Sequence, residues 1–214
     1  HDRTRTKNRI RSLLRGNGIT APHRRGLWTR KGLAWLPTVA LPTADTELAR
    51  DLLLDDLQRL ELALKRIERR LDQLAASHPG VRLLRTIPGV GPRTAEAVVA
   101  YIADPQRFRN SRRVGSYFGL VPCQDQSADR NRLGHITRQG PATVRRLLVE
   151  AAWQGVRRDA HLGRYFERVA RDDPARKKIA LVATAHHLVR CMAAMLKRSE
   201  GWRTGDATVA TAAA

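Results

Sequence analysis

The sequence predicts an all-α, mainly helical protein. Between residues 45 and 76, leucine and isoleucine recur at alternating spacings of four and three residues, which is the pattern of a coiled-coil seam. Elsewhere the apolar residues recur at helical spacing within segments that glycine and proline separate. With 214 residues, the chain is long enough for one or two domains with a real hydrophobic core.

The charge of the chain points to a polyanionic partner. Lysine and arginine number 40 and aspartate and glutamate number 20, so the formal net charge is +20. A basic excess of this size favours nucleic acid, and DNA in particular, as the partner. A ribosomal or membrane-surface protein would also be basic, so composition alone leaves those alternatives open.

The cysteine content argues against two kinds of site. Cys123 and Cys191 are the only cysteines, too few and too poorly spaced for a disulfide framework or a metal cage. We expect free thiols in a reducing compartment such as the cytoplasm. The most apolar run, residues 179–196, is interrupted by two histidines and an arginine, which predicts a buried helix and no membrane partner. The chain begins with His1, so we expect a fragment or a processed product.

The first region, residues 1–44, is predicted to be a basic helix with a connector. Residues 2–15 carry basic side chains at nearly every second position and a thin apolar seam. Such a helix can dock on a partner helix while its charged side faces a phosphate backbone, although a solvated charged face is the alternative. Residues 19–44 hold three prolines and two tryptophans, which indicates a structured connector with one short helix.

The second region, residues 45–78, is predicted to be the coiled-coil helix. Its seam is about three heptads long, too short to be stable alone. The partner is either the basic helix at residues 2–15 or the same helix of a second subunit. The seam consists of Leu53, Leu57, Leu60, Leu64, Ile67, Leu71 and Leu74.

The third region, residues 79–202, begins with a predicted helix-hairpin-helix motif. An aliphatic helix leads into a Gly-x-Gly turn at Gly89 and Gly91, and a second helix begins near Arg93. Two glycines let the backbone approach a DNA phosphate closely, and the free N–H groups of the second helix can donate to it. The alternative is a tight turn in which the glycines serve packing alone.

A polar segment holding Ser127 follows a helix predicted over residues 108–118. We expect this segment to be a loop that carries Arg130, Arg132 and Arg138 and runs into a helix beginning at residues 140–141. Two further arginines add basic charge at the flank of that helix. The expected DNA-binding arginines of this stretch are Arg130, Arg132, Arg138, Arg145 and Arg146.

A serine that faces basic side chains and the positive end of a helix suits a phosphate. Most serines in polar loops are structural, however, so spacing alone supports phosphate binding and no more. Beyond this stretch we expect helices over residues 161–170 and 175–198, with the latter at the centre of the domain, and a disordered tail over residues 203–214. The acidic pairs and the neighbouring histidines at 186 and 187 give no pattern of a metal site, so none is expected in this chain.

Three motifs in order carry a resemblance to a known family. They are residues 119–122 (GLVP), 134–140 (GHITRQG) and 146–152 (RLLVEAA), with Ser127 between the first and the second. These resemble the C-terminal transposase domain of the one-hundred-and-ten family of insertion sequences, whose members are bridge-RNA-guided DNA recombinases. Ala128 stands where the family usually has glycine.

The resemblance implies a role for Ser127 and for several partners. In the family this serine is the nucleophile, which attacks a DNA phosphodiester and holds the strand as a phosphoserine. The family also implies a guide (bridge) RNA and assembly of a homo-oligomer through the coiled coil. Its N-terminal RuvC-like domain supplies acidic residues and Mg²⁺. No match to that domain is present, so we expect no cofactor in this chain and no strand cleavage by this chain alone.

Two function classes therefore stand side by side. The first is the C-terminal portion of a DNA transposase or recombinase that supplies Ser127 for strand cleavage and exchange. The second is a non-catalytic helix-hairpin-helix DNA-binding module, or a decayed transposase remnant, in which Ser127 is at most a phosphate-contacting hydroxyl.

Overall fold

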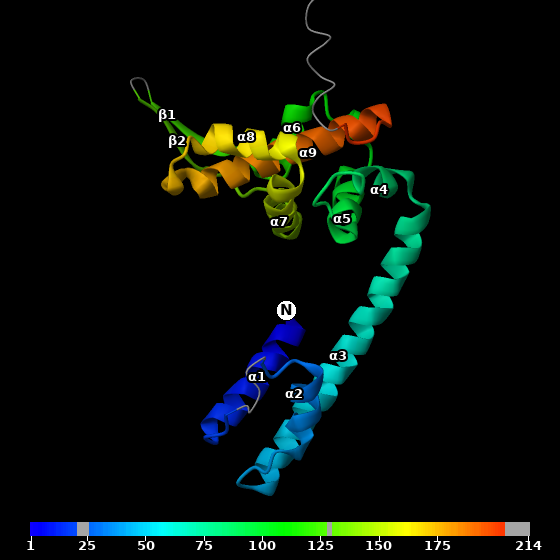
Figure 1. Cartoon of the computed structure of the whole chain (residues 1–214), viewed down its shortest axis with the longest axis vertical. Coiled ribbons are helices and arrows are strands. Elements are labelled where there is room, and N and C mark those ends of the chain that lie inside the picture. The colour runs from blue at the N-terminus through cyan, green and yellow to red at the C-terminus, as the bar shows by residue number, and fades with distance from the viewer. Residues whose placement is uncertain (21–25, 128–129, 204–214) are drawn as a thin grey trace, which may run out of the picture. The chain divides into compact units, whose positions relative to one another are not determined.

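The computed structural model describes residues 1–20, 26–127 and 130–203, and for residues 125–127 and 130–133 it describes the backbone alone (Figure 1). The described chain is mainly helical, as predicted. It divides into two compact units, the first from His1 to Leu71 and the second from Asp72 onward. The division falls inside the long helix α3 (Ala44–Ser77). The predicted disordered tail lies outside the described residues from position 204.

The first unit holds α1 (Asp2–Gly16), α2 (Arg30–Trp35), the 3-10 turn η1 (Leu36–Thr38) and α3 as far as Leu71. The short helix α2 begins where the Thr29 side chain accepts a hydrogen bond from the Gly32 N–H, which satisfies a donor that no helical carbonyl can reach. This helix is the one predicted within the connector.

The basic helix α1 packs on the first part of α3. Ile10 and Leu14 of α1 share one buried cluster with Leu57 of α3. Polar contacts flank that cluster, because the Thr6 hydroxyl donates to Asp56 at 3.2 Å. Of the two partners considered for the leucine seam, the helix at residues 2–15 therefore covers its first part.

The side chains in the later part of the seam are more exposed to solvent. Ile67 is 56% exposed and Leu74 is 51% exposed, whereas Leu57 is only 3% exposed. An apolar stripe of this kind on a helix indicates a surface for a further partner.

The second unit contains six α-helices, two 3-10 turns and a two-stranded sheet among its described residues. The helices are α4 (Pro79–Leu84), α5 (Pro92–Ile102), α6 (Ser111–Tyr117), α7 (Ala142–Arg158), α8 (Ala160–Ala170) and α9 (Lys177–Arg198). The 3-10 turns are η2 (Pro105–Arg107) and η3 (Pro174–Arg176), and the strands are β1 (Pro122–Ser127) and β2 (Arg130–Ile136). The helix expected over residues 108–118 is thus shorter, because the Asn110 side chain caps α6 by accepting from the Arg113 N–H.

Helix α9 is the centre of the second unit, as predicted. It contacts α4, α6, α7 and α8, and Leu188 and Met192 are fully buried among them. By length and composition alone, the segment 174–198 is apolar enough to cross a membrane. The core helix of a soluble protein passes the same test, and the buried face of α9 accounts for its apolar character here.

The junction of α7 and α8 is tied to two other parts of the unit. Asp159 is 4% exposed, and its carboxylate caps α8 by accepting from the Leu162 N–H at 2.9 Å. The same carboxylate accepts from the indole N–H of Trp202 at 2.8 Å. The backbone N–H of Trp202 donates to the Thr86 hydroxyl at 3.0 Å. Trp202 therefore fastens the segment after α9 to both the α7–α8 junction and the α4–α5 turn.

Candidate functional site

The segment that carries Ser127 is a β-hairpin. β1 and β2 pair antiparallel, with Ser127 opposite Arg130 and Asp125 opposite Arg132. The register shifts between Pro122 and Gln124, where Cys123 of β1 stands opposite both Gly134 and His135, which marks a bulge in β2. Ser127 is the last residue of its strand, and the connecting residues 128–129 lie outside the described residues.

The prediction of a polar loop at this place was wrong. The stretch is mostly polar and poor in β-branched residues, so neither β-propensity nor alternation of apolar residues indicates a strand. The hairpin is held by the hydrogen bonds of its backbone ladder, which the pattern of side chains does not reveal.

The base of this hairpin is pressed against the end of α6. Gly119 has a φ of +67°, and a Cβ there would lie 2.1 Å from the carbonyl oxygen of Gln139. Gly140 has a φ of +79°, and a Cβ there would lie 2.2 Å from the carbonyl oxygen of Tyr117. Both positions require glycine, for conformation and for space. The two glycines let the strand ends meet the end of α6 in direct backbone contact.

Arg145 fastens the same junction from the side of α7. Its Nη1 lies 3.1 Å, 3.0 Å and 3.4 Å from the carbonyl oxygens of Phe118, Gln139 and Gly140, respectively. A guanidinium is well suited to this task because it presents several donors in a rigid plane. Arg145 thus helps to hold the hairpin base, which limits its freedom to reach a phosphate.

Arg138 and Arg146 are both exposed and are not engaged in the way that Arg145 is. Arg138 follows β2 with a φ of +56°, and its side chain is exposed. Arg146 is exposed on the first half of α7. Neither forms an ion pair with a carboxylate whose position the structure describes. Of Arg130 and Arg132 the structure describes the backbone alone, on β2.

The two glycines of the α4–α5 turn differ in their surroundings. Gly89 has a φ of +92°, and a Cβ there would lie 2.5 Å from the backbone nitrogen of Gly155 in α7. Gly91, the N-cap of α5, is exposed and has open space where a Cβ would stand. Gly89 therefore serves close packing, and Gly91 is the glycine whose backbone is open to a ligand.

Arg93 at the start of α5 is engaged by two carboxylates. Its guanidinium lies 2.7 Å from Glu96 and 2.7 Å from Asp72. The hydrogen bond with Glu96 is the main cause that raises the pKa of Arg93, and burial opposes it. Its charge is largely balanced, so its pull on a phosphate is weaker than that of Arg138 or Arg146.

A cluster of titratable side chains that was not predicted lies between α8 and α9. The Nε2 atoms of His161 and His187 lie 3.0 Å apart and share a hydrogen bond, and Tyr165 stacks on the His187 ring. Burial, reinforced by the neighbouring His161, lowers the pKa of His187 to about 4. Burial also raises the pKa of the Cys191 thiol to about 11. Both groups are therefore neutral at pH 7.

The neighbouring histidine, His186, points elsewhere. It packs against Gly115 in α6, where a Cβ on the glycine would lie 2.1 Å from the imidazole ring. Burial is the main cause that lowers the pKa of His186. Within the part of the chain that the structure describes, no group of three or more His, Cys, Asp or Glu side chains is placed to hold a metal ion.

The sequence contains no local signal for this cluster. His161 and His187 are 26 positions apart, and only the packing of α8 on α9 brings them together. Trp202 reaches Asp159 across 43 positions in the same way.

A comparison with protein families places the middle of the chain among transposases. Residues 81–167 match the model described as the transposase IS116/IS110/IS902 family. This range begins in α4 and ends in α8, so it includes the α4–α5 turn, the hairpin and α7.

Curated relatives extend the similarity to nearly the whole chain. A probable family 20 transposase of Pseudomonas aeruginosa is 32% identical over 95% of this chain, and a putative transposase of Sinorhizobium fredii is 29% identical over 98% of it. The transposase for insertion sequence element IS1111A of Coxiella burnetii is 29% identical over 70% of this chain. The chain spans 61%, 55% and 42% of the length of these three relatives, respectively.

Proposed function

The chain belongs to the IS116/IS110/IS902 family of transposases, and from this premise we propose that it binds DNA and supplies Ser127 as the nucleophile of strand cleavage and exchange. The structural observation that best supports the proposal is the anchored hairpin. The hairpin carries Ser127 at the end of a strand, and the exposed Arg138 and Arg146 flank the place where it joins α7.

Electrostatics supports the binding part of the proposal. The chain has a formal charge of +20, and a protein that neutralises several phosphates releases the counterions condensed on DNA. The exposed turn at Gly91 fits the same partner, because α5 begins there with backbone N–H groups that lack helical acceptors. In this proposal α4, the turn and α5 act as a helix-hairpin-helix that grips the phosphate backbone.

The strand register supports the nucleophile. Alternate positions of a strand belong to one face, and opposite positions of an antiparallel pair share a face. Positions 125, 127, 130 and 132 therefore belong to one face of the ribbon. In this proposal the nucleophile occupies a position on the same face as two positions that hold arginine.

The proposed chemistry is a transesterification at phosphorus. The Ser127 oxygen forms a bond to the phosphorus of a DNA phosphodiester, and the bond from that phosphorus to a deoxyribose oxygen breaks. The serine proton passes to the surroundings, and the departing oxygen takes up a proton to become a hydroxyl. Positive charge from Arg130, Arg132 and Arg138 would stabilise the negative charge that grows on the phosphate oxygens.

Mg²⁺, which the resemblance implies, does not find a ligand set among the described residues of this chain. When bound to the acidic domain of a full-length transposase, it would supply activation of the attacking hydroxyl.

Two macromolecular partners complete the proposal. The exposed half of the α3 seam, around Ile67 and Leu74, would pair with the same helix of a second subunit, because its apolar spacing is that of a coiled coil. A guide RNA would bind the same basic protein, and this partner comes from the family resemblance alone.

The binding part is tested by the salt dependence of DNA affinity. Fluorescence anisotropy with a labelled duplex of arbitrary sequence should show the affinity falling by at least about 100-fold between about 50 and 200 mM salt. A duplex of unrelated sequence should give the same curve. An affinity that does not change over this range would contradict the electrostatic account.

A further inference from the structure

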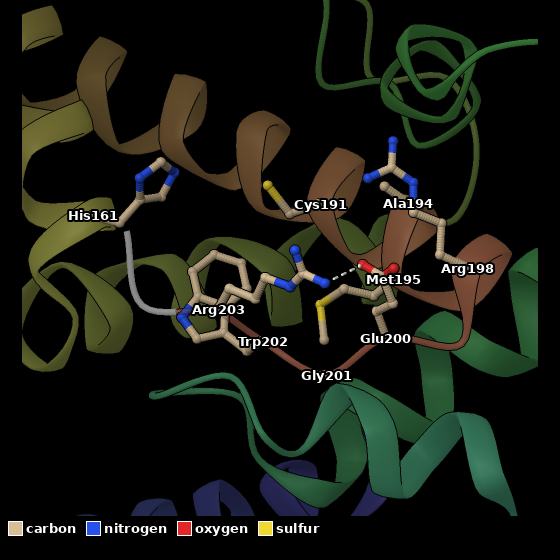
Figure 2. A pocket seen from close by; sticks show the side chains of 9 residues that line it. All are labelled: His161, Cys191, Ala194, Met195, Arg198, Glu200, Gly201, Trp202 and Arg203. Carbon is tan, nitrogen blue, oxygen red and sulfur yellow. Dashed lines mark ion pairs between the residues drawn. The ribbon is translucent and has the colours of Figure 1, made fainter. Parts of the chain in front are cut away.

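A pocket of about 200 Å³ lies between the last turns of α9 and the segment that folds back after it (Figure 2). Cys191, Ala194, Met195 and Arg198 line it from one face of α9, since they follow one another at helical spacing. His161 contributes from the start of α8, and residues 200–203 close the remaining side. None of these residues belongs to the hairpin or to the α4–α5 turn discussed above.

The aromatic wall of the pocket is held in place. Trp202 donates its indole N–H to Asp159 and its backbone N–H to Thr86, so the ring cannot turn freely. Its polar atom is already satisfied, and the ring therefore offers a ligand its apolar surface. His161 meets the indole edge to face at a centroid distance of 5.9 Å, which fixes the orientation further.

The floor of the pocket is apolar and uncharged. Ala194 and Met195 provide aliphatic surface, and the Cys191 thiol remains protonated because burial raises its pKa to about 11. Behind Cys191 lies His187, whose Nε2 is 3.6 Å from the sulfur and which is neutral at pH 7. A ligand group that enters this space must therefore present an apolar face to the floor of the pocket.

The rim, by contrast, carries positive charge. Arg203 is paired with Glu200 at 3.3 Å, as the dashed line in Figure 2 shows. Arg198 is exposed and forms no ion pair with a described carboxylate. The rim therefore has one cation in excess directly beside an apolar, aromatic-walled space.

We propose that this pocket receives one unstacked nucleobase of a bound nucleic acid, with the base against Trp202 and its phosphate at Arg198. A nucleotide is the ligand that combines a flat aromatic group with a negative charge next to it, and aromatic side chains hold extruded bases by stacking. The pocket, at about 200 Å³, is smaller than the sites of drug-sized molecules, which are about 300–1,000 Å³. This inference rests on the proposed function in that a nucleic acid must already be bound.

The probe is a labelled duplex with one unpaired 2-aminopurine, compared with the same duplex carrying an abasic site and with the fully paired duplex. The full chain should bind the unpaired base about 5-fold or more tightly than the abasic site, and stacking on the indole should quench the 2-aminopurine fluorescence. A second set, in which the unpaired nucleotide is a ribonucleotide within RNA, distinguishes an RNA source of the base from a DNA source.

Two variants change the pocket by different means. Ala194→Phe fills it, and Arg198→Gln removes the charge at the rim. Lys178→Gln is the control, because it removes one exposed charge from the first turn of the same helix. Ala194→Phe should abolish the preference for the unpaired base, Arg198→Gln should reduce it at least about 2-fold, and Lys178→Gln should preserve it. If Ala194→Phe lowers the melting temperature, the test rests on the other two variants. The preference for the unpaired base should then be weaker in Arg198→Gln than in Lys178→Gln.

The outcomes separate this inference from the proposed function. If the wild-type chain binds the paired duplex but does not distinguish the unpaired base from the abasic site in DNA or RNA, the pocket assignment is overturned and the DNA-binding function stands. If the wild-type chain shows no salt-dependent binding to any duplex, both the pocket assignment and the DNA-binding function are overturned. If Ala194→Phe instead abolishes self-association in light scattering, the pocket receives a protein side chain and the nucleobase assignment is wrong.

Discussion

Gly89 lies so close to Gly155 that a Cβ on the former would stand 2.5 Å from the backbone nitrogen of the latter. This contact joins the α4–α5 turn to α7, the helix that begins just after the Ser127 hairpin. Leu162 of α8 closes the other side of Gly155 at 2.6 Å from its Cβ position. Close backbone packing on α7 thus sets the position of the turn, while the Arg145 side chain ties the hairpin base to the same helix.

Gly89→Ala should destabilise the protein by at least about 2 kcal/mol, because alanine at a φ of +92° is strained and its methyl group overlaps α7. Gly91→Ala is the matched change two residues later, where there is open space. It should cost less than about 1 kcal/mol of stability. It should nevertheless weaken DNA binding, because the methyl group blocks close approach of the backbone to a phosphate. Chemical denaturation and anisotropy measure the two effects.

Two outcomes for these alanine variants would contradict the roles given to Gly89 and Gly91. Equal stability of Gly89→Ala and the wild type would show that the turn is not packed on α7. An unchanged DNA affinity of Gly91→Ala would show that the turn does not meet DNA.

Arg145→Met and Arg146→Met should distinguish an arginine that stabilises the hairpin base from one that binds DNA. Arg145→Met leaves three backbone carbonyl groups without their donor, so stability should fall by about 1–3 kcal/mol. Arg146→Met should leave the unfolding curve unchanged. It should lower DNA affinity and reduce the salt slope by about one. If Arg146→Met preserves the salt slope, Arg146 does not contact a phosphate.

Stability should rise with pH between about pH 4 and 6.5. The pKa of His187 is lowered in the folded state, so the unfolded state binds the proton first as the pH falls. The lowering to about 4 corresponds to at most about 3 kcal/mol, which partial solvent exposure reduces to about 2 kcal/mol. Denaturation curves of His187→Phe should show a flatter pH dependence, whereas His78→Gln, at an exposed histidine, should retain the slope. An unchanged slope in His187→Phe would show that other groups cause it.

Ile67→Asp should prevent self-association without unfolding the monomer. Ile67 is already 56% exposed within one chain, so an aspartate there meets solvent in the monomer but would be buried in a coiled coil. Light scattering should report the wild type as an oligomer and the variant as a monomer, with equal helicity by circular dichroism. Lys65→Asp changes charge at a neighbouring exposed position and should leave the oligomer intact. A wild type that is monomeric would contradict the proposed pairing.

The helices were predictable from the sequence because their apolar residues repeat at a constant spacing. The seam of α3 and the broad apolar face of α9 both show this repeat. The hairpin was not predictable, since its sequence is mostly polar without apolar alternation and its strands depend on pairing with each other.

The sequence indicated which residues to consider for the candidate site but not the contacts that each of them makes. Gly89 and Gly91 form one motif in the sequence, and only the position of α7 shows that the first packs while the second is open. Arg145 and Arg146 are adjacent, and helical rotation directs one to the carbonyl of Phe118 and the other to solvent. Such distinctions depend on contacts between distant parts of the chain.

Covalent attachment to DNA tests the central claim most directly. This chain would replace the matched 61% of the Pseudomonas aeruginosa relative, so that the remaining part of that transposase is present. With Mg²⁺, a guide RNA and its DNA target, the chimera should form an adduct that resists denaturing electrophoresis. Ser127→Ala should abolish the adduct while changing duplex affinity by less than about 1 kcal/mol. An adduct that persists in Ser127→Ala, or its absence from the unaltered chimera, would contradict Ser127 as the nucleophile.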